Sequence, residues 1–100
     1  MGQNQTYADE LRIITLTPDV STYNTIDALI IAASVDLVKG AKIQVNLIPA
    51  ATATLKDQVT GQTVGLIADE VRMFPALNFT TQFALISADT VACEVYIEKD

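Results

Sequence analysis

The sequence contains no histidine and no tryptophan, and it has one cysteine, four glycines and three prolines. Without histidine the chain cannot form the Ser–His or Cys–His pairs of common nucleophilic enzymes, nor a His-ligated zinc site. The single cysteine, Cys93, excludes an internal disulfide and a cysteine-rich metal site. Glycine and proline are too scarce for a linker or a collagen-like chain. We therefore expect no enzymatic activity, no metal site and no cofactor.

Positive charge is also scarce. Six Lys and Arg stand against twelve Asp and Glu, which gives a formal net charge of −6. Such a balance argues against a surface for nucleic acid or for an anionic membrane. Residues 1–10 are polar and acidic and do not resemble a signal peptide. The longest apolar stretch, residues 28–38, is interrupted by Ser34 and Asp36 and is too short to span a bilayer.

The composition is that of a folded domain. The chain has 100 residues, of which 50% are hydrophobic and 18% charged, so it is expected to form one compact unit. Adjacent carboxylates occur at Asp9-Glu10 and Asp69-Glu70. Neighbouring side chains on a strand point to opposite faces, so neither pair is expected to converge on a substrate or a cation.

Strand-forming residues dominate, with 12 Thr, 10 Ile and 9 Val. Residues 91–97 alternate, with Val91, Cys93, Val95 and Ile97 on one face, and residues 42–48 repeat the pattern. A period of two predicts half-buried strands, and it makes Cys93 a buried small hydrophobe. Weaker strands are predicted at residues 11–16, 52–56, 63–67, 70–74 and 82–87. Short strands at this spacing, separated by turn residues, favour a sandwich or a small barrel.

Residues 26–39 are ambiguous. Ile26, Leu29 and Ile30 follow helical spacing, Asn24 or Thr25 is placed to cap a helix, and Gly40 stands where a helix would end. The apolar run of residues 28–33 equally suits a strand that is buried on both faces. Because the surroundings are rich in β-strand signals, we predict a strand.

The aromatic residues suggest contacts with proteins. They are not interleaved with Lys or Arg, which argues against stacking on nucleic acid bases. Phe74 and Phe83 are expected in the core. Tyr7 and Tyr23 lie in polar segments and are predicted to contact a partner protein.

The order of features from Ile13 to Ile97 resembles that of small tailed-bacteriophage virion proteins, including head-decoration and spike-base proteins. The features are Pro18-Asp19, Asp27-Ala28-Leu29-Ile30-Ile31, an alternating strand, Gly65, Val71-Arg72-Met73-Phe74-Pro75, Thr80-Thr81 and the closing Thr90-Val91-Ala92 strand. The resemblance implies a small β-sandwich that assembles on a capsid or tail as an oligomer, without catalytic activity.

These observations together predict an all-β, single-domain β-sandwich of jelly-roll type at residues 11–100, preceded by an N-terminal arm at residues 1–10. The expected function is a structural virion protein that decorates or cements a bacteriophage capsid, assembled in the host cytoplasm. Its expected partners are the major capsid protein or another virion protein, and further copies of itself in a trimer. The alternatives are a tail or spike-base component and a carbohydrate-binding β module, although the absence of tryptophan speaks against the latter.

Overall fold

The computed structural model describes residues 10–33, 41–75 and 78–98, which form eight strands and two short helices. The strands are β1 (Glu10–Leu16), β2 (Asn24–Thr25), β3 (Ala41–Pro49), β4 (Ala53–Asp57), β5 (Thr63–Leu66), β6 (Arg72–Pro75), β7 (Phe83–Ser87) and β8 (Val91–Glu98). The helices are α1 (Ile26–Ala33) and α2 (Phe79–Gln82). The protein is therefore mostly β, as predicted.

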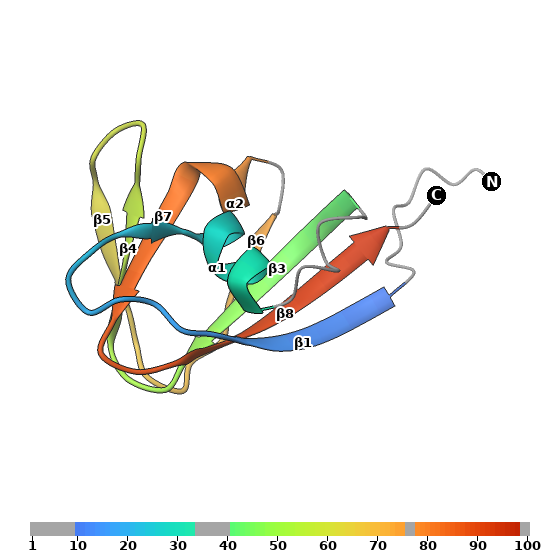
Figure 1. The fold of residues 1–100 in the computed structure, drawn as a ribbon, viewed down its shortest axis with the longest axis horizontal. Coiled ribbons are helices and arrows are strands. Elements are labelled where there is room, and N and C mark those ends of the chain that lie inside the picture. The colour runs from blue at the N-terminus through green and yellow to red at the C-terminus, as the bar shows by residue number, and fades with distance from the viewer. Residues whose placement is uncertain (1–9, 34–40, 76–77, 99–100) are drawn as a thin grey trace.

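The strands form two four-stranded sheets in which every pair is antiparallel (Figure 1). Sheet A has the order β1-β8-β3-β6, and sheet B has the order β2-β7-β4-β5. Four of the pairs, β1 with β8, β2 with β7, β3 with β6 and β4 with β5, nest inside one another around the β4–β5 turn. The chain thus folds as one long hairpin that is rolled up on itself. This brings β8 beside β3 in sheet A and β7 beside β4 in sheet B.

The alternating pattern of the sequence determines which face of each strand is buried. Val91, Cys93, Val95 and Ile97 of β8 are all buried, as predicted. On the neighbouring β1, Leu16 is fully buried and Ile13 is 68% exposed.

One core cluster joins the two sheets and the helices. Its buried members are Leu16, Ile26, Leu29, Ile30, Val45, Leu47, Ala53, Leu55, Leu66, Phe79, Leu85, Val91, Cys93, Val95 and Ile97, and Ile14, Phe74 and Phe83 pack against it. Full burial of one such aliphatic side chain contributes roughly 1.5–3 kcal/mol to stability. Phe74 and Phe83, which were predicted in the core, are partly buried and pack against its edge.

The strand predicted at residues 26–39 is wrong for residues 26–33, which form helix α1, and residues 34–39 lie outside the described residues. The Ala28 backbone N–H donates to the Thr25 hydroxyl at 3.2 Å, which satisfies a donor in the first turn. The helix buries Ile26, Leu29 and Ile30, spaced three and four residues apart, and leaves residues 31–33 exposed. A strand covered on both faces would have required burial of the whole run.

The first strand includes the last residue of the predicted arm. Strand β1 begins at Glu10, and residues 1–9 of the predicted arm lie outside the described residues, as does Gly40. Among the described residues, no helix combines the length and apolar character needed to cross a membrane.

Candidate interaction surfaces

Four loops lie together at one end of the molecule. They are the connections β1–β2, β3–β4, β5–β6 and β7–β8, comprising residues 17–23, 50–52, 67–71 and 88–90. Because all strand pairs are antiparallel and each of these loops crosses between the sheets, their strand ends meet at the same end. We call these four loops the loop end; in Figure 1 they lie along the left and lower margins.

Backbone hydrogen bonds tie the loop end together. Three of them connect one loop or strand end to another: Ala50 N–H to Thr90 O at 3.0 Å, Asp69 N–H to Pro49 O at 2.8 Å, and Ser87 N–H to Asp19 O at 3.0 Å. In addition, the carboxylates of Asp19 and Asp89 each accept the N–H of the following residue at 2.7 Å. The loops therefore hold one another in place.

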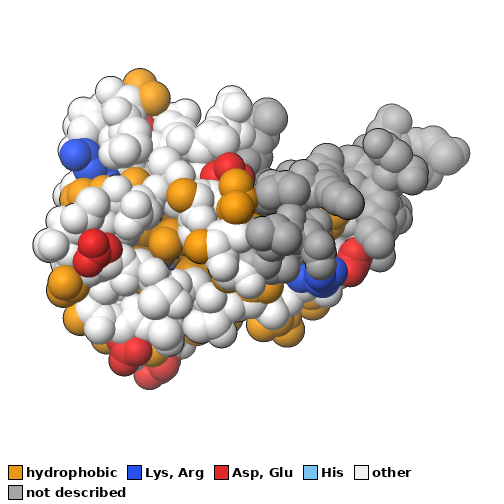
Figure 2. Space-filling model, viewed as in Figure 1, with side chains coloured by type: hydrophobic (Ala, Val, Ile, Leu, Met, Phe, Trp, Pro, Cys, Tyr) orange, Lys and Arg blue, Asp and Glu red, His pale blue; other side chains and the backbone are white. Residues whose placement is uncertain are grey.

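The loop end combines exposed apolar and acidic side chains. Val20, Ile67 and Val71 are 64%, 61% and 50% exposed. The same loops carry four carboxylates, those of Asp19, Asp69, Glu70 and Asp89. They contain no Lys or Arg. Figure 2 shows apolar and acidic side chains beside one another along the lower-left margin. Within the described ranges, no three His, Cys, Asp or Glu side chains are placed to hold a metal ion.

The outer face of sheet A, which points away from the core, is a second exposed surface. At its centre, the Gln44 side chain donates to Asn46 Oδ1 at 2.9 Å, and Asn46 Nδ2 donates to Glu94 Oε1 at 2.9 Å. Asn46 is only 4% exposed, so these bonds satisfy a buried amide. Exposed apolar side chains lie on the two edge strands, with Ile13 on β1 and Met73 on β6 each 68% exposed.

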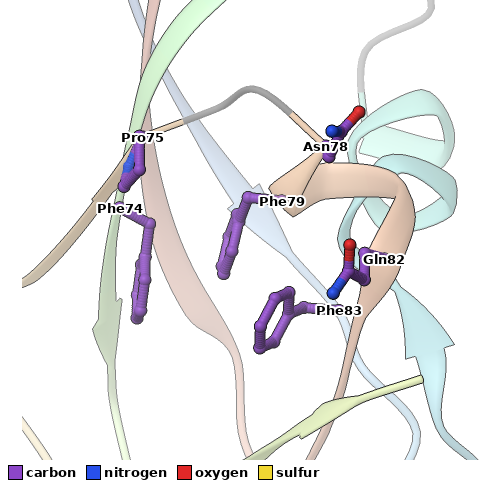
Figure 3. Close-up of a pocket in the computed structure, with 6 residues that line it drawn as sticks. All are labelled: Phe74, Pro75, Asn78, Phe79, Gln82 and Phe83. Carbon is purple, nitrogen blue, oxygen red and sulfur yellow. The ribbon is translucent and has the colours of Figure 1, made fainter. Parts of the chain in front are cut away.

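Three phenylalanines form a stack between the sheets and line a pocket (Figure 3). The ring centroids of Phe74 and Phe79 are 4.3 Å apart, and those of Phe79 and Phe83 are 5.0 Å apart. The pocket has a volume of about 230 Å³, and Pro75, Asn78 and Gln82 complete its lining.

Helix α2 is tied to the β4–β5 turn beside this pocket. Gln82 Nε2 donates to Asp57 Oδ1 at 3.1 Å, and the same oxygen accepts the Val59 N–H at 2.8 Å. The backbone N–H of Val59 and then the Gln82 amide lower the pKa of Asp57 from its ordinary value of 3.8, because both stabilise the carboxylate. The side-chain amide of Gln82, which lines the pocket, is therefore already hydrogen-bonded to Asp57.

The structure describes one of the two tyrosines that were predicted to bind a partner. Tyr23 lies in the β1–β2 loop, is half-buried, and has the Lys56 Nζ 5.1 Å from its ring centroid. Tyr7 lies outside the described residues. Contact of either tyrosine with a partner stays a prediction.

Cys93 is fully buried, as predicted. Burial raises the pKa of its thiol to about 12, and the neighbouring negative charge of Glu94 adds to the effect. A protonated, inaccessible thiol is a packing residue rather than a nucleophile.

Neither the loop end nor the phenylalanine stack is predictable from local sequence patterns. Turn residues such as Pro18-Asp19 and Asp69-Glu70 mark loops, but only the pairing of the strands shows that alternate loops share one end. The stack joins β6, α2 and β7, and no local pattern predicts that contact.

Comparisons with known proteins found no matching family model, no matching curated protein and no matching solved structure. The resemblance to bacteriophage virion proteins therefore rests on the sequence alone.

Proposed function

We propose that this protein is a non-enzymatic structural protein of a bacteriophage virion, which decorates or cements the capsid through protein–protein contacts. The observation that carries the proposal is the loop end, where exposed valine and isoleucine side chains stand among four carboxylates on hydrogen-bonded loops. Exposed apolar residues surrounded by polar ones are characteristic of protein interaction sites. The expected partner is a capsid or other virion protein with a basic and apolar surface.

The strand order supports a jelly-roll β-sandwich as the finer description of the fold. Eight strands in two four-stranded sheets, nested as a rolled hairpin, match that architecture. Jelly rolls occur in viral capsid domains, but also in lectins, so the fold alone does not select a function. The sequence resemblance is what favours the virion.

The first test is the composition of the particle. In purified virions of the virus that encodes this chain, mass spectrometry should detect it in amounts comparable with the major structural proteins. Cryo-electron microscopy should place it on the outer capsid surface. Its location at the tail or spike base would favour that component instead, and its absence from the particles would overturn the proposal.

The second test concerns the loop end. Val20→Lys places a positive charge at an exposed apolar position in an acidic surface. It should reduce binding to particles lacking the native chain by about tenfold or more. Val59→Lys is a matched control, because Val59 is 75% exposed in the β4–β5 turn at the opposite end. Equal losses for both variants, or full retention by Val20→Lys, would rule out the loop end as the contact.

A carbohydrate-binding module is the second candidate, because the pocket of Phe74, Phe79 and Phe83 is also lined by the amide side chain of Asn78. Apolar pockets with a few polar groups are the usual form of small-ligand sites. Glycan-array binding that is lost on Phe74→Ala would favour this function over capsid decoration.

A further inference from the structure

We infer that two copies of this chain associate edge to edge through strand β1, forming an antiparallel β1–β1 pair that joins their two sheets A. Strand β1 is an edge strand, hydrogen-bonded to β8 on one side, and no described strand lies on its other side. Unpaired backbone groups at such an edge are ready to bind another strand. The inference concerns the isolated protein and does not depend on its being a virion component.

Strand length singles out β1 among the four sheet edges. It has seven residues, whereas the edge strands β5 and β6 have four each and β2 has two. Its length corresponds to about 24 Å of edge. Short edge strands discourage pairing, so only β1 has the length to support it.

Helix α1 packs against β1 from the core side. It buries Ile26, Leu29 and Ile30 in the core, on the inner side of β1. On the other side of the strand, Leu11 and Ile13 are 46% and 68% exposed. The outer face of β1 therefore presents two exposed apolar side chains.

Symmetry limits how two copies can pair. A two-fold axis perpendicular to the sheet brings side chains of the same face together, so one residue of β1 lies opposite its own counterpart. An axis through Arg12 would oppose two guanidinium groups, and an axis through Ile14 would pair only five of the seven residues. An axis through Ile13 pairs all seven residues.

The Ile13 register is complementary in chemistry as well as in length. It places Ile13 opposite Ile13 of the second copy and Leu11 opposite Thr15, so the exposed Ile13 side chains of the two copies meet on the outer face of the joined sheets. On the inner face it places Glu10 opposite Leu16 and Arg12 opposite Ile14, so no two like charges oppose each other directly. Each copy keeps its own Arg12–Glu10 ion pair, in which the two side chains are 3.0 Å apart.

This arrangement predicts a dimer rather than the trimer expected from the resemblance. A single strand pair is a small interface, so the dimer should dissociate within the micromolar range. Light scattering or sedimentation of the full chain should show a mass rising from 10.8 kDa toward twice that value as concentration increases. A monomer at every concentration would overturn the inference and would mean that the charges of Glu10 and Arg12 protect the edge.

Cysteine cross-linking tests the register. In an antiparallel pair, directly opposite Cα atoms are about 4.5–5.5 Å apart, within the range of a disulfide. Ile13→Cys should therefore form a disulfide-linked dimer on mild oxidation. Thr15→Cys is the matched control, because the two copies of residue 15 would lie four positions apart, or about 14 Å. Equal cross-linking of both variants would contradict the proposed register.

Charge substitution gives an independent test on the same strand. Ile13→Lys and Ile13→Glu should each raise the dissociation constant by about tenfold or more, because like charges then oppose each other. An equimolar mixture of the two variants should restore a dimer. Met73→Lys, at the opposite edge of sheet A, should leave the dimer unchanged. Loss of the dimer in Met73→Lys, or no recovery in the mixture, would refute pairing through β1.

Discussion

Replacing Cys93 by serine tests the packing of sheet A at a fully buried position. Cys93 lies on the central strand β8, opposite Ile14 of β1 and Leu47 of β3, and its exposure is 0%. Serine keeps the shape of the side chain but introduces a hydroxyl group that needs a hydrogen-bond partner. Both of these cross-strand neighbours are aliphatic, so neither offers the hydroxyl a side-chain partner.

Burying an unpaired hydroxyl costs about 1–3 kcal/mol in folded proteins. For a domain of this size, about 2 kcal/mol corresponds to a fall in melting temperature of about 8–16 °C. Cys93→Ala is the control, because it removes the sulfur without adding a polar group and leaves a void that costs about 1 kcal/mol. The serine variant should therefore be the less stable of the two.

Thermal and urea unfolding of the three proteins measures these differences directly. A second readout is the reaction of the native thiol with a thiol reagent at pH 8. With its pKa raised to about 12 by burial, the Cys93 thiol is about one part in ten thousand thiolate at that pH. The reaction should consequently be slow and should accelerate on unfolding. A serine variant at least as stable as the alanine variant, or rapid labelling of the native protein, would refute the buried position.

Three other local features and the N-terminal arm give further predictions. Thr25→Val removes the hydroxyl that caps α1 and should lower the free energy of unfolding by about 1 kcal/mol in urea titrations. Gly61→Ala, at a φ of 80°, should cost about 1 kcal/mol by the same measurement, although no atom lies within 4 Å of the added carbon. The lowered pKa of Asp57 means that its ionised form stabilises the fold above pH 3.8 and that this stabilisation is lost as pH falls through the lower folded pKa. Asp57→Asn should therefore be less stable than the parent at neutral pH, and the difference should vanish in strong acid. Deleting residues 1–9 should leave the melting temperature nearly unchanged but weaken binding to the particle, and Tyr7→Ala should show part of that loss in the same retention assay.

The strands could be predicted from the sequence because each buries one face. The alternation around Cys93 and Val95 fixed the inward side of β8, and the structure places these residues in the core. Helix α1 could not be predicted with the same method, because a short apolar run satisfies both periods. Tertiary packing selects the helix over a strand. The buried residues of α1 fill the core beside β1 and β2, while Ile31 remains 38% exposed.

The candidate surfaces were less predictable than the strands. An exposed valine such as Val20 carries no signal by itself, since isolated apolar residues are common on protein surfaces. Its significance arises from the sheet order, which brings its loop to the same end as Asp69 and Val71. The edge position of β1 likewise depends on its pairing with β8, which is distant in the sequence.

The loop end and the β1 edge together determine how the two loop ends of a dimer are oriented. This orientation bears on whether the protein would decorate or cement a capsid. The loop end lies at the carboxyl end of β1, so antiparallel pairing of two β1 strands points the two loop ends in opposite directions. If both proposals hold, the dimer would present two contact sites that face apart, one for each of two capsid subunits. Binding through two sites strengthens attachment beyond the affinity of each. Ile13→Lys, which leaves the loop end intact, should accordingly still bind particles but stabilise them less against heating than the parent protein does. If it stabilises particles fully, the chain decorates the capsid through single contacts, and bridging by the dimer does not contribute.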